Sequence, residues 1–185
     1  MIMKREFLHN EIWILTFAGG FQRAKIYTGT IDEDQRSEYR QMLRDKIEEL
    51  IEQHYQTNVS EEEHLEHIQS TITYSDSLLK FQNKVKMNFG IAQKLLNLYL
   101  KYLWCLGELK IVPPHFPVDR IIQEQLNEKA KGFKLKPLKI EPWTQFLDKS
   151  KYMAIIQFAH KIMEASNGQL NYSLPELELN LFARR

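Results

Sequence analysis

The most informative hydrophobic pattern of the chain lies in residues 89–106. When these residues are placed at about 100° per residue, as in an α-helix, the polar ones fall within one narrow arc. Almost every position outside that arc is apolar or aromatic. A surface helix is polar over much of its circumference, so a helix this apolar is surrounded by other elements. The pattern predicts a central, mostly buried helix with one polar stripe. The stripe consists of Gly90, Gln93, Lys94, Asn97 and Lys101.

Amphipathic patterns elsewhere predict that most of the chain is helical. Ser60 and Glu63 have the spacing of a capping box, and Asn88 and Gly107 are a suitable start and stop for the apolar helix. Prolines make residues 112–117 a fixed loop. The other predicted helices cover residues 34–56, 60–72, 119–131 and 143–165, with a less regular short helix within 74–86.

Two segments leave alternatives open. Residues 11–17 are β-branched and aromatic and precede Gly19 and Gly20, which fits a small β-hairpin near the N-terminus or a helix that breaks at the glycines. We favour a helix followed by a loop. In residues 173–182 leucines alternate with polar residues, as in a strand, but Ser173 and Glu176 have the spacing of a helix start. We favour a helix there too.

Length and composition are those of an ordinary globular protein. The chain has 185 residues, of which 43% are hydrophobic and 26% are charged, which is enough for one domain with a sizeable core. Neither internal repeats nor a convincing linker divides it. We therefore predict an all-α, or mainly α, fold in which residues 1–185 form a single compact multi-helix domain around helix 89–106.

The single cysteine, Cys105, lies within the apolar helix and has no partner for a disulfide. We therefore expect a buried thiol and a reducing compartment. No stretch approaches the length of about 18 consecutive apolar residues that marks a membrane span. The first residues also lack the order of basic, apolar and small residues of a signal peptide. These features predict a cytoplasmic protein that makes no contact with a membrane.

The formal net charge is only +1, but the charges are segregated along the chain. Residues 32–66 carry twelve acidic and four basic side chains, residues 80–110 carry six lysines and one acid, and residues 129–139 carry five lysines and no acid. Such blocks can face each other, solvent, a second copy of the chain, or an acidic protein or nucleic acid. A nearly neutral chain argues against strong general binding of nucleic acid.

The polar stripe is the first candidate for a ligand-binding site. A buried lysine is costly unless it is paired, so Lys94 and Lys101 must reach water, an acid or a bound anion. Gln93 and Asn97 lie one turn apart and offer both donors and acceptors. Together the four side chains can hold a phosphate, a nucleotide base or a peptide backbone. In the structural alternative, the amides bond the carbonyls of the proline-rich loop and the lysines point to solvent.

His115, Asp119 and Arg120 are the second candidate group, and they would be catalytic only in an enzyme. His115 would act as general base, Asp119 would orient it and Arg120 would bind an anion. A small ligand that touches both groups requires His115 to lie within about 10 Å of Asn97. In the structural alternative, Asp119 caps a helix and Arg120 forms a surface ion pair.

A third cluster contains Glu61, His64 and His67 but does not predict a metal site. Glu61 and His64 have the spacing of half a di-iron carboxylate site, yet no second Glu-x-x-His is present. Two histidines three residues apart leave a closed zinc site short of ligands. The segment is interpreted as a solvated helix start. Because phosphate-binding loops and nucleophile motifs are also absent, the cofactor is unknown.

One motif resembles a pattern in uncharacterised bacterial proteins of similar length. It reads Gly90-x-Ala92-Gln93-Lys94-Leu95-Leu96-Asn97-Leu98-x-Leu100-Lys101-Tyr102, followed by Pro117-Val118-Asp119-Arg120. The resemblance covers residues 85–125 and carries no assigned activity. It therefore implies no cofactor, substrate or catalytic role.

Three functional hypotheses follow. The first, which we favour, is a non-catalytic binding or accessory protein that engages an acidic partner, either a protein or a nucleic acid. The second is an enzyme that acts on a phosphate-bearing or nucleotide substrate. The third is a homo-oligomer in which the acidic helix 34–56 meets a lysine-rich segment of another copy.

Overall fold

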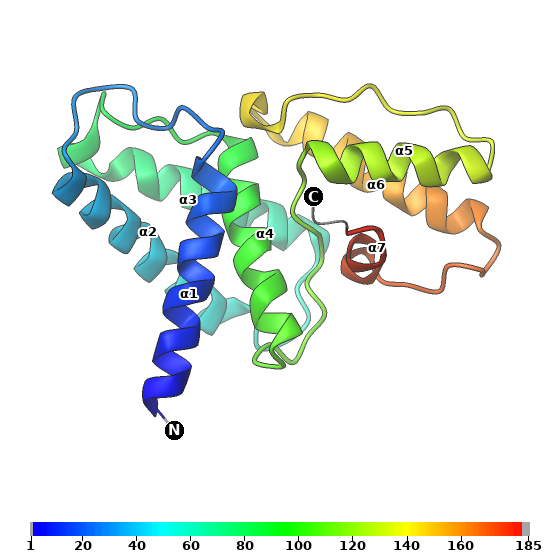
Figure 1. Ribbon diagram of the computed structural model, residues 1–185, viewed down its shortest axis with the longest axis horizontal. Helices are drawn as coiled ribbons and strands as arrows, with labels where there is room; N and C mark the ends of the chain where they lie inside the picture. The colour runs from blue at the N-terminus through cyan, green and yellow to red at the C-terminus, as the bar shows by residue number, and fades with distance from the viewer. Residues whose placement is uncertain (1, 183–185) are drawn as a thin grey trace.

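The computed structural model describes residues 2–182, and its regular secondary structure is helical (Figure 1). Within these residues no strand occurs, and the β-type pairing consists of an isolated bridge between Tyr27 and Val85. This confirms the predicted all-α class. The α-helices are α1 (Ile2–Phe21), α2 (Glu33–His54), α3 (Glu61–Ser77), α4 (Phe89–Cys105), α5 (Arg120–Gly132), α6 (Lys149–Ala165) and α7 (Leu174–Leu181), and the 3₁₀ helices are η1 (Leu79–Phe81) and η2 (Trp143–Gln145).

Helix α4 is buried along most of its length. Every residue from Phe89 to Lys101 is buried, as is Leu103. The helix packs against α1, α3 and η2. In the view of Figure 1, α1 and α2 lie on one side of α4, and α5, α6 and α7 lie on the other. Among the helices of residues 2–182, none combines the length and apolar character that crossing a bilayer requires.

Reciprocal capping boxes start α3 and α7, as the sequence predicts. Ser60 and Glu63 exchange hydrogen bonds at the start of α3, and Ser173 and Glu176 do the same at the start of α7. The tail is therefore a helix and not a strand. Each box forms between residues close in sequence, which is why both were predictable.

The N-terminal segment is a helix followed by a loop, as favoured from the sequence, and not a hairpin, but α1 does not break at its glycines. The helix continues through Gly19 and Gly20 to Phe21. A Cβ atom at Gly20 would lie 2.6 Å from Cδ2 of Leu95, and one at Gly19 would lie 2.6 Å from Cδ1 of Leu98. The glycines therefore allow α1 to pack closely on α4 and do not form a turn.

Residues 143–165 form two elements where one helix was predicted. The 3₁₀ helix η2 comes first, and α6 begins after Asp148, whose side chain accepts from the Ser150 N–H at 2.7 Å. In the less regular segment 74–86, α3 continues to Ser77 and the short η1 helix follows it. In both places a 3₁₀ turn replaces a predicted α-helical turn.

The 3₁₀ helix η2 is in close contact with the start of α4. A Cβ atom at Gly90 would lie only 1.8 Å from the carbonyl oxygen of Trp143. The Gly90 N–H donates to the Phe146 carbonyl at 3.0 Å. The backbone of η2 thus sits directly on the first turn of α4.

The prediction that the Cys105 thiol is buried is wrong, because the residue is exposed. It lies in the last turn of α4, beyond the part that other elements cover. Gly107 follows with a φ of +72°, the left-handed conformation that favours glycine just past a helix end.

Candidate functional site

Lys94, the first lysine of the polar stripe, forms an ion pair with Asp119. Its Nζ lies 2.7 Å from Oδ2 of Asp119, and its side chain is only 7% exposed. The other oxygen of Asp119 accepts from the Ile122 N–H and caps α5. Burial opposes the charge of Asp119, but Lys94 and the backbone N–H groups outweigh it and keep the pKa of Asp119 below its ordinary value. Asp119 therefore holds α4 and α5 together.

Lys101 forms a second ion pair, with Glu178 of α7. Its Nζ lies 2.7 Å from Oε2 and 2.8 Å from Oε1 of Glu178. The two side chains are 10% and 5% exposed. Burial raises the pKa of Glu178, although the Lys101 ammonium acts in the opposite direction. Both stripe lysines thus have acidic partners from the same chain.

Gln93 bonds the main chain of Val118, the residue after Pro117. Its Nε2 donates to the carbonyls of Val118, at 2.9 Å, and Gly90, at 3.0 Å. Its Oε1 accepts from the Val118 N–H at 3.1 Å. This is the structural alternative for Gln93, in which the loop satisfies the amide. Because the main chain of one residue, Val118, supplies both a donor and an acceptor, it fixes which end of the Gln93 amide is oxygen.

Asn97 takes its orientation from Gln93. Its Nδ2 donates to Oε1 of Gln93 at 3.3 Å and to the Tyr152 hydroxyl at 3.0 Å. Its Oδ1 lies 2.9 Å from Nε2 of His64. An amide oxygen only accepts, so the His64 ring carries its proton on Nε2. The loop peptide at Val118 thus determines the tautomer of a histidine on another helix.

The network continues from His64 toward α2. Its Nδ1, which carries no proton, lies 2.6 Å from the Tyr55 hydroxyl and accepts from it. The Tyr55 oxygen in turn lies 3.1 Å from Nδ1 of His67. Complete burial lowers the pKa of His64 well below its ordinary value, so the ring is neutral.

On the other side, the network runs from Tyr152 to the surface. The Tyr152 oxygen accepts from Asn97, so its own proton is available to Nδ1 of His115 at 3.0 Å. His115 then carries its proton on Nε2, 3.6 Å from Oε1 of Glu61. His160 lies 2.9 Å from the same oxygen. His115 and His160 lower the pKa of Glu61 to about 2. The hydrogen bonds therefore point in one direction, from His67 to His115, whose Nε2 makes only the 3.6 Å ion-pair contact with Glu61.

The structure brings together only some members of the polar stripe and of the second candidate group, His115, Asp119 and Arg120. Asn97 and His115 bond the same hydroxyl, which satisfies the expected separation of less than about 10 Å. Each is 1% exposed. Asp119 pairs with Lys94 and not with His115, and the Arg120 side chain is 69% exposed and pairs with Glu124. Among residues 2–182, no group of three or more His, Cys, Asp or Glu residues has a metal-binding arrangement.

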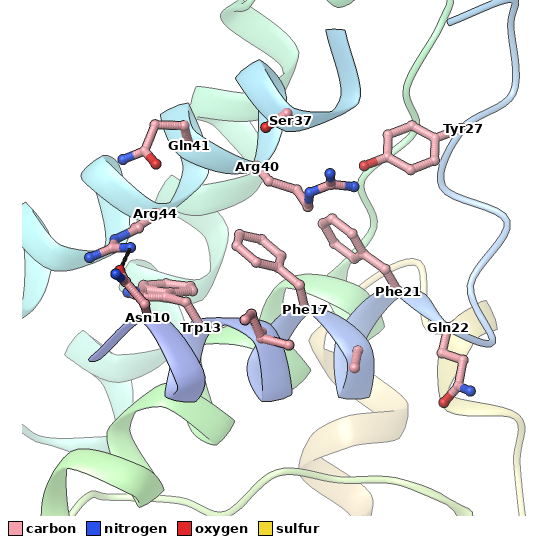
Figure 2. A pocket seen from close by; sticks show the side chains of 12 residues that line it. Asn10, Trp13, Phe17, Phe21, Gln22, Tyr27, Ser37, Arg40, Gln41 and Arg44 are labelled. Carbon is pink, nitrogen blue, oxygen red and sulfur yellow. Dashed lines mark hydrogen bonds between the residues drawn. The ribbon is translucent and has the colours of Figure 1, made fainter. Parts of the chain in front are cut away.

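An open groove between α1 and α2 was not predicted from the sequence (Figure 2). Its volume is about 580 Å³. Trp13, Phe17 and Phe21 of α1 form the floor, with 5.2 Å between successive ring centroids. Tyr27 lies beside Phe21 at one end, with 6.2 Å between the ring centroids. The spacing of four residues between the three α1 rings is the sequence signal that could have revealed this floor.

Two arginines of α2 form the opposite wall of the groove. Arg40 bonds Glu33 at 2.7 Å, and Arg44 bonds Glu48 at 3.1 Å and Asn10 at 2.7 Å. Glu33 is 69% exposed. An exposed ion pair such as Arg40–Glu33 contributes only about 0–1 kcal/mol, so a carboxylate that enters the groove can replace Glu33.

The polar network around Asn97 and the groove between α1 and α2 differ in their exposure to solvent. The polar network around Asn97 is sealed by its own hydrogen bonds, whereas the groove is open to solvent. Comparison of the chain with protein-family models, curated proteins and solved structures gives no match.

Proposed function

We propose that this protein is a non-catalytic binding protein that holds an acidic protein partner in the groove between α1 and α2. The open groove itself, with an aromatic floor and a guanidinium wall, is the observation that supports this function. Buried aromatic and arginine side chains dominate the binding energy of many protein interfaces. The floor suits large apolar side chains, and Arg40 and Arg44 suit carboxylates.

The groove fits a protein better than a nucleic acid. Glu33 and Glu48 already offset the charges of Arg40 and Arg44, so the wall is not a continuous basic stripe. Binding to a phosphate backbone requires such a stripe. The lysine-rich residues 129–139 lie at the end of α5 and in the loop after it, apart from the groove (Figure 1).

The test uses a fluorescein-labelled amphipathic peptide of about 20 residues, the length of α1. It carries Leu and Phe on one face and Glu on both edges, and a matched peptide carries Lys in place of Glu. We expect the wild-type protein to bind the acidic peptide in fluorescence anisotropy, and the double variant R40E/R44E to bind it at least about tenfold more weakly.

The double variant K149E/K161E is the matched control, because it changes the net charge equally on exposed positions of α6. R40Q/R44Q and far-UV circular dichroism separate loss of binding from loss of folding. Equal affinity for the acidic and basic peptides, or unchanged affinity of R40E/R44E, would refute the proposal. Preferential, salt-sensitive binding of DNA or RNA would replace the protein partner with a nucleic acid.

An enzyme acting on a phosphate-bearing or nucleotide substrate is the second candidate. One observation favours it: the Tyr152 hydroxyl joins His115 to Asn97. However, Lys94 and Lys101 already hold carboxylates of the chain, so a substrate would have to displace them. This function therefore has less support than partner binding.

The same proposal includes one domain of residues 1–185, built around α4, in a reducing, cytoplasmic setting. One cluster of buried apolar side chains runs from Ile12 in α1 to Leu177 in α7, which supports a single core. The free thiol of Cys105 suits a reducing compartment. A homo-oligomer held by segregated charges has less support, because several acids of α2 pair with arginines of the same helix.

A further inference from the structure

The exposed face of α1 carries a repeat that extends beyond the groove. Its members follow one another at alternating intervals of four and three residues, the a/d spacing of helices that pair along their length. The N-terminal members lack cover: Met3 is 81% exposed, Phe7 63% and Ile14 61%. We call this face the α1 stripe. It consists of Met3, Phe7, Asn10, Ile14, Phe17 and Phe21.

The α1 stripe and the groove form one continuous surface. The C-terminal half of the stripe, from Asn10 to Phe21, also lines the groove. The N-terminal half extends past the end of α4 in the view of Figure 1. At about 1.5 Å per residue, the whole stripe is roughly 30 Å long. The stripe is therefore longer than the groove, which only its members from Asn10 to Phe21 line.

We propose that the acidic partner presents an α-helix, which lies along the entire α1 stripe with its acidic edge against Arg40 and Arg44. This inference rests on the proposed function and specifies the shape of the partner. Charge complementarity with the two arginines places the acidic edge on the α2 side. Asn10 lies within the stripe, with Oδ1 held by Arg44 at 2.7 Å, and a single polar residue at such a position fixes the register of helix pairing.

A helix is the occupant that this surface can accept. The groove lies between two helices, and the residues around it offer no sheet edge. An extended peptide on the aromatic floor would gain none of the main-chain hydrogen bonds that a sheet edge gives to an added strand. A helix bonds its backbone N–H and C=O groups internally and docks through side chains alone.

A second copy of α1 does not provide the same complementarity. Its polar positions are mixed, with Lys4 and Arg5 beside Glu6 and Glu11. Such a helix has no consistently acidic edge for Arg40. The face of α1 opposite the stripe packs on α4, so α1 also lacks the free basic face of a helix that lies on a membrane.

The experiment measures binding of the acidic peptide to M3S/F7S, a variant changed only at exposed positions outside the groove. We expect its affinity for the peptide to fall by about tenfold, because two apolar contacts are lost. We also expect the peptide to gain helical circular dichroism when the wild-type protein is added. The variant L79S/L147S is the matched control, because it changes two exposed leucines away from α1.

The outcomes separate this inference from the proposed function. If R40E/R44E weakens binding and M3S/F7S does not, the groove still binds an acidic partner, but the helix along α1 is refuted. If neither variant weakens binding, both proposals fail. Binding without a gain of helix also refutes the inference. So does a dimer in light scattering, or binding to phosphatidylserine vesicles, that M3S/F7S abolishes.

Discussion

Asn97 connects more of the molecule than any cap or surface pair described above. Its amide bonds His64 of α3 and Tyr152 of α6 as well as Gln93 of its own helix. Each partner is at most 1% exposed, so none can use bulk water in place of the amide. A buried polar group that loses its partner retains its full desolvation cost. The side chain therefore matters more for stability than its size indicates.

Replacing Asn97 with Ala should lower the free energy of unfolding by about 2–4 kcal/mol, because it leaves His64 Nε2–H without an acceptor and opens a small cavity. Urea denaturation measures the loss. Asn180→Ala, at an exposed position of α7, is the control and should change stability by less than about 0.5 kcal/mol. Similar losses for the two variants would show that the network does not stabilise the fold.

The sequence predicted that the polar residues of α4 share a face, but not what they bond. Periodicity is a local property and assigns Gln93 and Asn97 to one stripe. Their partners Val118 and Tyr152 lie 25 and 55 residues away in the chain. Only tertiary structure brings such groups together. The need for a partner at Lys94 was predictable from the cost of burial, whereas its identity was not.

At the scale of elements, glycines determine how closely η2 and α1 pack against α4. Gly90 allows η2 to sit on the first turn of α4, and Gly20 allows α1 to cross it. On intrinsic propensity alone, alanine stabilises a helix by about 1 kcal/mol relative to glycine. Substitution at these positions therefore tests packing against propensity, because the two effects have opposite signs.

Gly90→Ala should lower the melting temperature by roughly 6–12 °C, the equivalent of about 3 kcal/mol in a chain of this size. A Cβ there would lie 1.8 Å from the Trp143 oxygen, a backbone atom that cannot rotate away. Gly132→Ala, where a Cβ meets nothing within 4 Å, is the control and should leave the melting temperature unchanged or slightly higher. Differential scanning calorimetry gives both values. A Gly90→Ala protein as stable as wild type would exclude the close contact.

Helix starts were predictable where a short-range cap defines them, as at Ser60 and Ser173. The break between η2 and α6 was missed, although the polar residues 148–151 interrupt the hydrophobic pattern there and Asp148 caps α6. Its tertiary counterpart, the contact of η2 with Gly90, is not visible in the local sequence. For the same reason, Gly19 and Gly20 suggested a turn from local sequence, although they serve the packing of α1 on α4.

At the scale of the whole molecule, ion pairs of α4 hold elements that are distant in sequence. Lys94 binds the start of α5, and Lys101 binds α7. A buried pair is a weak source of net stability, but the loss of one partner is severe, because the remaining charge has no water. The raised pKa of Glu178 shows that its charge is already costly in the intact pair.

Lys101→Met should destabilise the fold by about 3–5 kcal/mol near pH 8 and by less near pH 5. A carboxyl with a raised native pKa binds its proton more tightly in the folded state, so stability falls as pH increases from the ordinary value of 4.5 through the native pKa. Removal of the ammonium raises that pKa further and strengthens the trend. Urea denaturation at the two pH values measures it.

The double variant K101M/E178L should recover most of the loss, because it removes both charges and keeps apolar side chains of similar volume. A pH-independent loss in K101M, or a double variant less stable than the single one, would show that the pair is not the source of the effect.

The order in which the partners of α4 occur along the chain has a consequence for synthesis. A ribosome extrudes α1 to α4 first, whereas Asp119, Tyr152 and Glu178 emerge later. Until then, the nascent helix has ammonium and amide groups that cannot enter a nonpolar interior. Helix α4 therefore reaches its final packing only after Glu178 has been synthesised. Before that point, the incompletely folded chain exposes apolar surface of the kind that chaperones bind.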